Sequence, residues 1–125
     1  MNLEPVQLKI THEYLAPDGS EIYPLVKGSK GNLCQCILPV GGISKAISHK
    51  TIEELWYFLD GKGEVWRKGL NHDRPIAVQP GTSLVIPVNT TFQFRNTGRI
   101  PLKFLIVSMP PWPGDSEVSY EAGLW

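Results

Sequence analysis

Short apolar runs with a period of two, separated by turn residues, constrain this chain more than any other feature. They lie at residues 32–38, 54–59, 63–68, 83–88, 91–95 and 101–107. No window of helical length carries apolar residues at i, i+3, i+4 and i+7, and 12 glycines and 11 prolines interrupt most candidate helices. Many short strands with evenly spaced turns predict an all-β domain, either a sandwich or a closed barrel.

The chain of 125 residues has the usual length of a single domain with one core. We expect the core barrel over residues 31–109, with N-terminal edge strands within residues 1–30. Residues 110–125 are expected to form an irregular strap. Its Trp112 and Trp125 can pack back onto the barrel or onto a partner subunit.

The charge balance limits the classes of partner. Twelve basic and twelve acidic side chains cancel, whereas proteins that bind nucleic acid usually carry a basic stripe. The first ten residues contain an acid and a proline where a signal peptide would place an apolar run, and no stretch approaches membrane-spanning length. The sequence therefore predicts a cytoplasmic protein that binds neither nucleic acid nor membrane.

Cys34 and Cys36 are the two cysteines of the chain. On one strand they would point to the same face, too far apart and too parallel to form a disulfide without distortion. We interpret them as reduced, buried thiols, since free cysteines are commonly buried as small apolar residues. The alternative is a pair of soft metal ligands, which would need one or two further ligands nearby.

Two segments have a regular spacing of glycine, polar and apolar residues. The first reads G-x5-I-x-H-x4-E-x6-G and is formed by Gly41, Ile47, His49, Glu54 and Gly61. The second reads G-x5-P-x-N-x2-F-x3-N and is formed by Gly81, Pro87, Asn89, Phe92 and Asn96. They resemble, interval for interval, the two motifs of the cupin family, G-x5-H-x-H-x4-E-x6-G and G-x5-P-x-G-x2-H-x3-N.

With the flanking strands, the resemblance to cupins covers nearly the whole chain. It implies a double-stranded β-helix, a jelly-roll-like barrel in which two facing sheets surround a cavity. It also implies metal-ligand positions at Ile47, His49, Glu54 and Phe92. Two of these four residues are apolar here, and sites that hold transition metals firmly normally have at least three protein ligands.

A tight metal site is therefore not expected, and no cofactor is assigned. His49 and Glu54 would be the ligands if a divalent transition metal were retained. The missing ligands would then have to come from a cysteine, from another histidine or from the substrate, and the chain offers Cys34, Cys36, His12 and His72. His12 is more readily interpreted as an edge or surface residue, and His72 as a solvated turn residue.

The period of two predicts which side chains face the cavity. Glu54, Trp56 and Phe58 share one face of their strand, and Phe92 and Phe94 share one face of theirs. The resemblance points Glu54 and Phe92 inward, which gives an aromatic pocket with a few polar groups. The expected ligand-binding residues are Ile47, His49, Glu54, Trp56, Phe58, Phe92 and Phe94. Trp66, Arg67, Lys68 and Arg95 could add a cationic lip, although ordinary surface charge is the alternative.

Three functional hypotheses follow. The first is a protein that binds a small organic ligand, a sugar or an organic acid. The second is a metal-independent isomerase or epimerase in which His49 is the base and Glu54 its partner or acid, which the resemblance to epimerases of this fold permits. Burial would raise the pKa of Glu54 unless His49 donates a hydrogen bond to it or stands protonated beside it. The third is a metal-dependent cupin enzyme, a dioxygenase or isomerase, with substituted ligands.

Two N-terminal segments, residues 6–14 and 20–26, are predicted edge strands. Exposed sheet edges are liabilities that proteins usually cover. The resemblance suggests pairing of edge strands across a two-fold axis. We therefore expect a homodimer.

Overall fold

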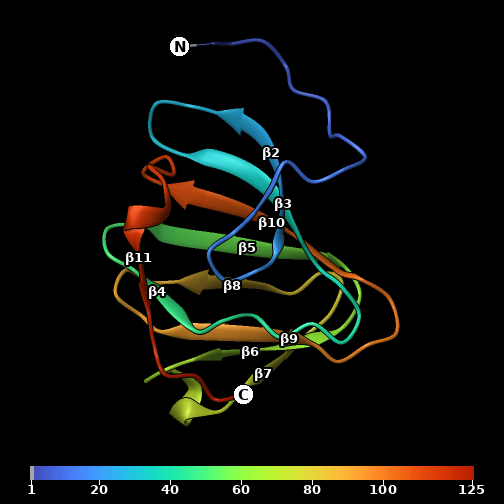
Figure 1. The fold of residues 1–125 in the computed structure, drawn as a ribbon, viewed down its shortest axis with the longest axis vertical. Coiled ribbons are helices and arrows are strands. Elements are labelled where there is room, and N and C mark those ends of the chain that lie inside the picture. Colours follow the sequence, from blue (N-terminus) through green and yellow to red (C-terminus); the bar gives the residue numbers. More distant parts are fainter. Residues whose placement is uncertain (1) are drawn as a thin grey trace.

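The computed structural model describes residues 2–125 and consists of two antiparallel sheets that face each other (Figure 1). One sheet has the order β1 (Tyr14–Leu15), β2 (Glu21–Lys27), β3 (Asn32–Leu38), β10 (Leu102–Met109), β5 (Glu53–Asp60) and β8 (Ser83–Ile86). The other has the order β11 (Val118–Tyr120), β4 (Ile47–His49), β9 (Phe92–Asn96), β6 (Gly63–Arg67) and β7 (Ile76–Val78). Two 3-10 turns, η1 (Asn71–Asp73) and η2 (Asp115–Glu117), complete the elements. Among residues 2–125 no helix has the length and apolar character needed to span a membrane.

The alternation along β5 is the predicted one. Glu54, Trp56 and Phe58 are buried between the sheets, whereas Leu55 and Tyr57 are exposed on the outer face. A period of two produces this split because successive strand residues point to opposite faces of a sheet. The six longer strands expected from the sequence are all present, so the prediction of an all-β fold is confirmed.

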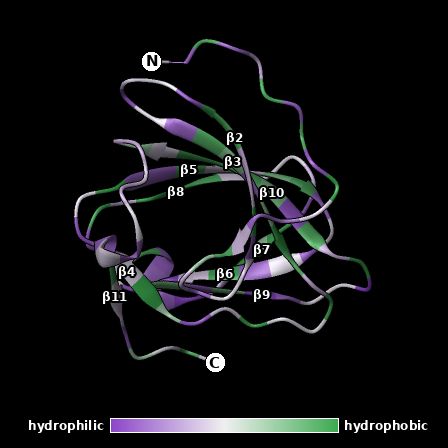
Figure 2. Ribbon diagram, turned by 45° about the horizontal axis from the view of Figure 1, so that its top comes forward, coloured by the Kyte–Doolittle hydropathy of each residue, from purple (hydrophilic) through white to green (hydrophobic). Residues whose placement is uncertain are grey.

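Aromatic rings from both sheets form the centre of the core. Figure 2 shows the two sheets facing each other, with hydrophobic segments in green on strands of both. The ring centroid of Phe104 on β10 lies 4.6 Å from that of Trp56 and 4.7 Å from that of Phe58. Phe94, on β9 of the other sheet, lies 5.4 Å from Phe104 in an edge-to-face arrangement. Such geometry adds to the hydrophobic burial that joins the sheets.

The N-terminal edge differs from the prediction. Residues 6–13 are outside the strands, and only Tyr14 and Leu15 pair with β2. Val6, Leu8 and Ile10 alternate as a strand would, but all three are exposed. Alternation alone does not make a strand when no core lies beneath the apolar face.

Three strands of three residues each, β4, β7 and β11, were not predicted. β11 lies within residues 110–125 and pairs with β4, so part of the expected strap extends the five-stranded sheet.

Asn89 occupies the position where the cupin motif has glycine, and its φ of 61° is in the left-handed region that asparagine tolerates. Its backbone N–H donates to the carbonyl of His49 at 2.8 Å, so the second motif holds the end of β4.

Candidate ligand-binding site

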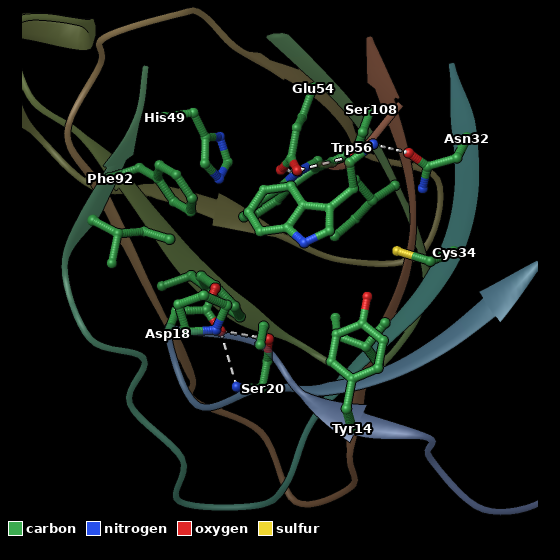
Figure 3. A pocket seen from close by; sticks show the side chains of 17 residues that line it. Tyr14, Asp18, Ser20, Asn32, Cys34, His49, Glu54, Trp56, Phe92 and Ser108 are labelled. Carbon is green, nitrogen blue, oxygen red and sulfur yellow. Dashed lines mark hydrogen bonds between the residues drawn. The ribbon is translucent and has the colours of Figure 1, made fainter. Parts of the chain in front are cut away.

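A cavity of about 50 Å³ lies between the two sheets, walled by 17 residues (Figure 3). β3, β5 and β10 supply one wall, β4 and β9 the other, and residues 14–22 and Trp112 supply the rest. The lining residues are Tyr14, Ala16, Pro17, Asp18, Ser20, Ile22, Asn32, Cys34, Ile47, His49, Glu54, Trp56, Phe92, Phe94, Ile106, Ser108 and Trp112. The volume is room for a few water molecules or a very small organic group.

His49 enters this cavity from the end of β4 and is 2% exposed. Its ring packs against Phe92, with centroids 5.3 Å apart, and against the edge of Trp112 at 5.5 Å. Burial lowers the pKa of His49 to about 4, against the opposing effect of the Glu117 carboxylate. Within residues 2–125 its Nδ1 atom is buried without a hydrogen-bond partner. His49 is therefore a neutral imidazole, and none of the described residues hydrogen-bonds to its Nδ1 atom.

Glu54 enters from β5 and is held by two hydrogen bonds. Trp56 Nε1 donates to Oε1 at 2.9 Å, and Ser108 Oγ donates to Oε2 at 3.2 Å. Burial raises the pKa of Glu54 to about 7, because desolvation outweighs these two hydrogen bonds. A raised pKa is what the sequence predicts for Glu54 when His49 does not donate to it, and no hydrogen bond among the described residues joins the two side chains.

Asp18 and Ser20 lie across the cavity from Glu54, and the hydroxyl of Tyr14 points into the same space (Figure 3). Asp18 Oδ1 accepts from the Ser20 backbone N–H at 2.9 Å and from Ser20 Oγ at 2.6 Å. Burial raises the pKa of Asp18 above its ordinary value. Sequence reasoning missed this wall, because the segment Pro17–Ser20 shows only a turn signal.

Trp112 closes the cavity from the C-terminal side. Its backbone N–H donates to Asn32 Oδ1 at 2.7 Å, which ties the segment after β10 to the start of β3. The expectation that Trp112 packs onto the barrel is met by this contact and by its ring against His49. Nothing in the local sequence distinguished this tryptophan from Trp125, which lies beside Arg95 on the surface.

Six of the seven expected ligand-binding residues line the cavity together. They are Ile47, His49, Glu54, Trp56, Phe92 and Phe94. Phe58 shares the inward face of β5 but is fully buried against Trp56 and Phe104 in the core, away from the cavity wall.

The four residues of the expected cationic lip do not line the cavity. Arg95 is paired with Glu64, with Nη2 and Oε1 2.6 Å apart. Arg67 donates to the carbonyl of Val85 at 2.8 Å and to Asn71 Oδ1 at 2.6 Å. These two cations are thus already engaged on the outside of the barrel.

The residues at the metal positions of the fold do not fit a metal. Ile47 and Phe92 face each other directly across β4 and β9, and both are buried. No cluster of three or more His, Cys, Asp or Glu side chains suited to an ion occurs in residues 2–125.

His12 and His72 are exposed, as expected for surface residues. Cys34 and Cys36 are buried free thiols as predicted, and burial raises the pKa of Cys34 to about 12, far from thiolate formation.

A family model for the cupin domain matches residues 35–108, more than half of the chain. The chain belongs to the cupin family. The uncharacterized protein MJ1618 of Methanocaldococcus jannaschii is 36% identical to this cupin over 104 residues, which are 79% of this chain and 80% of that protein.

Two solved structures confirm the double-stranded β-helix fold of this cupin. An uncharacterized conserved protein with a double-stranded β-helix domain from Klebsiella pneumoniae superposes with a TM-score of 0.68 at 14% identity, covering 89% of this chain and 93% of that chain. A variant of Streptomyces PAC13, solved with uridine, superposes with a TM-score of 0.72 at 9% identity, covering 95% and 92%. At these identities the likeness concerns the fold alone.

Proposed function

We propose that this cupin binds a small organic molecule in the cavity through its own side chains rather than through a metal. The observation that carries the proposal is that the same cavity is lined by His49, which is buried, and by the carboxyl group of Glu54, which Trp56 and Ser108 hold in place. A ligand that hydrogen-bonds to these two buried polar side chains offsets part of the cost of their desolvation. Aromatic walls beside a few fixed polar groups are typical of small-molecule sites.

The lining chemistry favours one of the two expected ligand classes. Neither lysine nor arginine is among the residues that line the cavity, whereas the carboxyl groups of Glu54 and Asp18 both are. An organic acid would bring a further negative charge beside them without a counter-ion. A hydroxylated, sugar-like ligand avoids that repulsion, and PAC13 with uridine is an instance of such a molecule with a barrel of this shape.

A metal-independent isomerase is the second candidate, favoured by the opposite pKa shifts of His49 and Glu54. Near pH 6 both groups are neutral, so His49 can take a proton from a carbon next to a carbonyl while Glu54 donates one to the carbonyl oxygen. The C–H electron pair becomes the C=C bond of an enol, and with an α-hydroxy carbonyl compound this enol is an enediol. His49 then returns its proton to the former carbonyl carbon while Glu54 takes the proton of the other enediol oxygen, so the carbonyl group has moved to the neighbouring carbon and both side chains regain their starting protonation states.

A thermal-shift screen of small metabolites, repeated with His49→Ala and Glu54→Gln, tests the proposal. We expect ligands that raise the melting temperature of the wild-type protein and lose this effect in both variants. Glu53→Gln is the matched control, because Glu53 is the exposed neighbour on the same strand. Binding that persists in both cavity variants would place the ligand elsewhere and overturn the proposal.

Proton exchange separates the two candidates. An isomerase would exchange a carbon-bound proton of its bound carbonyl compound with deuterated water, and both cavity variants would stop the exchange. A binding protein would hold the same compound without any exchange. The wild-type protein and Glu53→Gln serve as the references for the rate.

A further inference from the structure

The acceptor-rich character of the cavity indicates what the ligand must carry. Glu54 has one hydrogen bond to each carboxylate oxygen, and both donors, Trp56 Nε1 and Ser108 Oγ, belong to the wall itself. Asp18 Oδ1 takes both hydrogen bonds from Ser20, and no described hydrogen bond ends on its Oδ2. Since the hydroxyls of Ser20 and Ser108 are already committed to carboxylates, these donors are not available to a ligand.

His49 adds a third acceptor of a different kind. The residue lines the cavity and is 2% exposed. A neutral imidazole has one ring nitrogen that can only accept a hydrogen bond. Figure 3 shows His49 and Glu54 entering from one side of the cavity and Asp18 from the other. Three acceptor groups from three separate elements therefore converge on one space.

The positive charge that two carboxylates would need is missing from the wall. No lysine or arginine is among the described residues that line the cavity, whereas the aromatic rings of Trp56, Phe92 and Phe94 are part of its wall. The faces of aromatic rings attract cations and offer nothing to an anion. An ammonium group has three donors and one positive charge, which is the complement of this set of acceptors.

We infer that the ligand of this cavity is a small organic amine in its protonated form, with Glu54 as its counter-ion and the His49 ring and Asp18 as further acceptors. The inference rests on the proposed function and names the class of molecule bound at that same site. The hydroxyl of Tyr14 and the amide of Asn32 are the remaining polar groups on the wall, since Asn32 Oδ1 alone is used by Trp112. They suit a hydroxyl on the same ligand, so a small amino alcohol fits the wall better than a simple amine.

Three two-carbon probes separate charge from size. Ethanolamine, ethylene glycol and glycolate differ mainly in carrying a positive, a neutral and a negative group. Binding is measured on the wild-type protein by the shifts of the His49 ring signals in nuclear magnetic resonance, at about pH 8, where the Glu54 carboxyl is ionised and ethanolamine is a cation. We expect ethanolamine to bind about tenfold or more tightly than ethylene glycol, and glycolate most weakly, because a buried charge pair is strongly favoured over an unpaired charge.

The variants Glu54→Gln and Glu53→Gln show which carboxylate is responsible. Glu54→Gln should reduce the advantage of ethanolamine over ethylene glycol to about twofold or less, whereas Glu53→Gln should leave it unchanged. The ranking of the probes on the wild-type protein needs no variant, so the test stands even if Glu54→Gln folds poorly.

Equal or tighter binding of ethylene glycol or glycolate would overturn the amine inference and leave the proposed function standing. Shifts of the His49 signals with none of the three probes would also overturn the amine inference. If, in addition, no compound of the metabolite screen shifted those signals, the proposed function would fall with it.

Discussion

The pKa values of His49 and Glu54 are shifted in opposite directions, and the two residues make opposing contributions to the pH dependence of stability. The carboxyl of Glu54 holds its proton up to about pH 7 in the fold, against an ordinary pKa of 4.5. Between these values the folded chain binds more protons than the unfolded chain, so the free energy of unfolding falls as pH rises. His49 has a pKa lowered from 6.5 to about 4. Between pH 4 and 6.5 the unfolded chain binds more protons at this residue than the folded chain does. The contribution of His49 to the free energy of unfolding therefore rises with pH.

Single substitutions of His49 and Glu54 should reveal the two opposing pH dependences of the free energy of unfolding. In Glu54→Gln the His49 contribution remains, and the free energy of unfolding should rise by about 3 kcal/mol from pH 4 to 6.5. In His49→Ala the Glu54 contribution remains, and the free energy of unfolding should fall by about 3 kcal/mol from pH 4.5 to 7. Urea unfolding at a series of pH values measures both, with Glu53→Gln as the control that keeps the wild-type profile. Slopes of the same sign in the two variants would contradict the assignment.

Ile47 and Phe92 stand where the resemblance places two metal ligands. The double variant Ile47→His, Phe92→His restores the four-ligand set with His49 and Glu54, and we expect it to bind one zinc ion per chain. The reason is that a site of four ligands meets the tetrahedral preference of zinc, whereas two ligands do not. Equilibrium dialysis measures the stoichiometry, and adding Glu54→Gln to the double variant should weaken binding. Equally tight zinc binding by the wild-type protein would show that the two apolar residues are not decisive.

Local patterns predicted some residues of the site and could not predict others. His49 and Glu54 follow from the spacing of the first motif, and Trp56 follows from the period of two along β5, because both patterns lie within one short stretch of sequence. Asp18 and Trp112 reach the cavity through contacts between distant segments, which no local pattern encodes. The same holds for Ser108, a donor to Glu54 that lies 54 residues away in the sequence.

The longer strands were predicted from the sequence, whereas the shortest ones were not. Strands of four or more residues, such as β3 and β5, show a clear alternation, whereas β4, β7 and β11 have three residues each and no readable period. The N-terminal segment shows the converse case, because residues 6–13 alternate but form no strand. Strand formation there depends on a neighbouring strand and a core, neither of which lies beside these residues.

The turn from β5 to β6 depends on Gly61. Its φ is +84°, and a Cβ atom would lie 2.6 Å from the carbonyl oxygen of Pro101. Gly61→Ala should therefore lower the free energy of unfolding by at least about 2 kcal/mol, from left-handed strain and overpacking together. Gly69→Ala is the matched control, with a φ of +81° and no atom near the added Cβ, and should cost about 1 kcal/mol. Chemical denaturation of both variants measures the difference, and equal losses would refute the steric account.

On the scale of the whole molecule, the exposed apolar face of the six-stranded sheet suggests a homodimer. Leu55 is 44% exposed, and its cross-strand neighbour Val85 is also exposed, beside Tyr57 at 48%. Apolar patches of this kind often mark interfaces between proteins. Sedimentation velocity should show a dimer at micromolar concentration that Leu55→Asp converts to monomer. Ile100→Asp, an exposed residue outside the strands, should leave the dimer intact, and a monomeric wild-type protein would contradict this proposal.

Native mass spectrometry of gently purified protein tests most directly whether the barrel binds organic molecules through its own side chains. We expect the mass of the bare chain or dimer, or of that species with a small organic molecule, and the organic adduct should disappear in Glu54→Gln. A mass increase of one transition-metal ion per chain, lost in both His49→Ala and Glu54→Gln, would contradict the account.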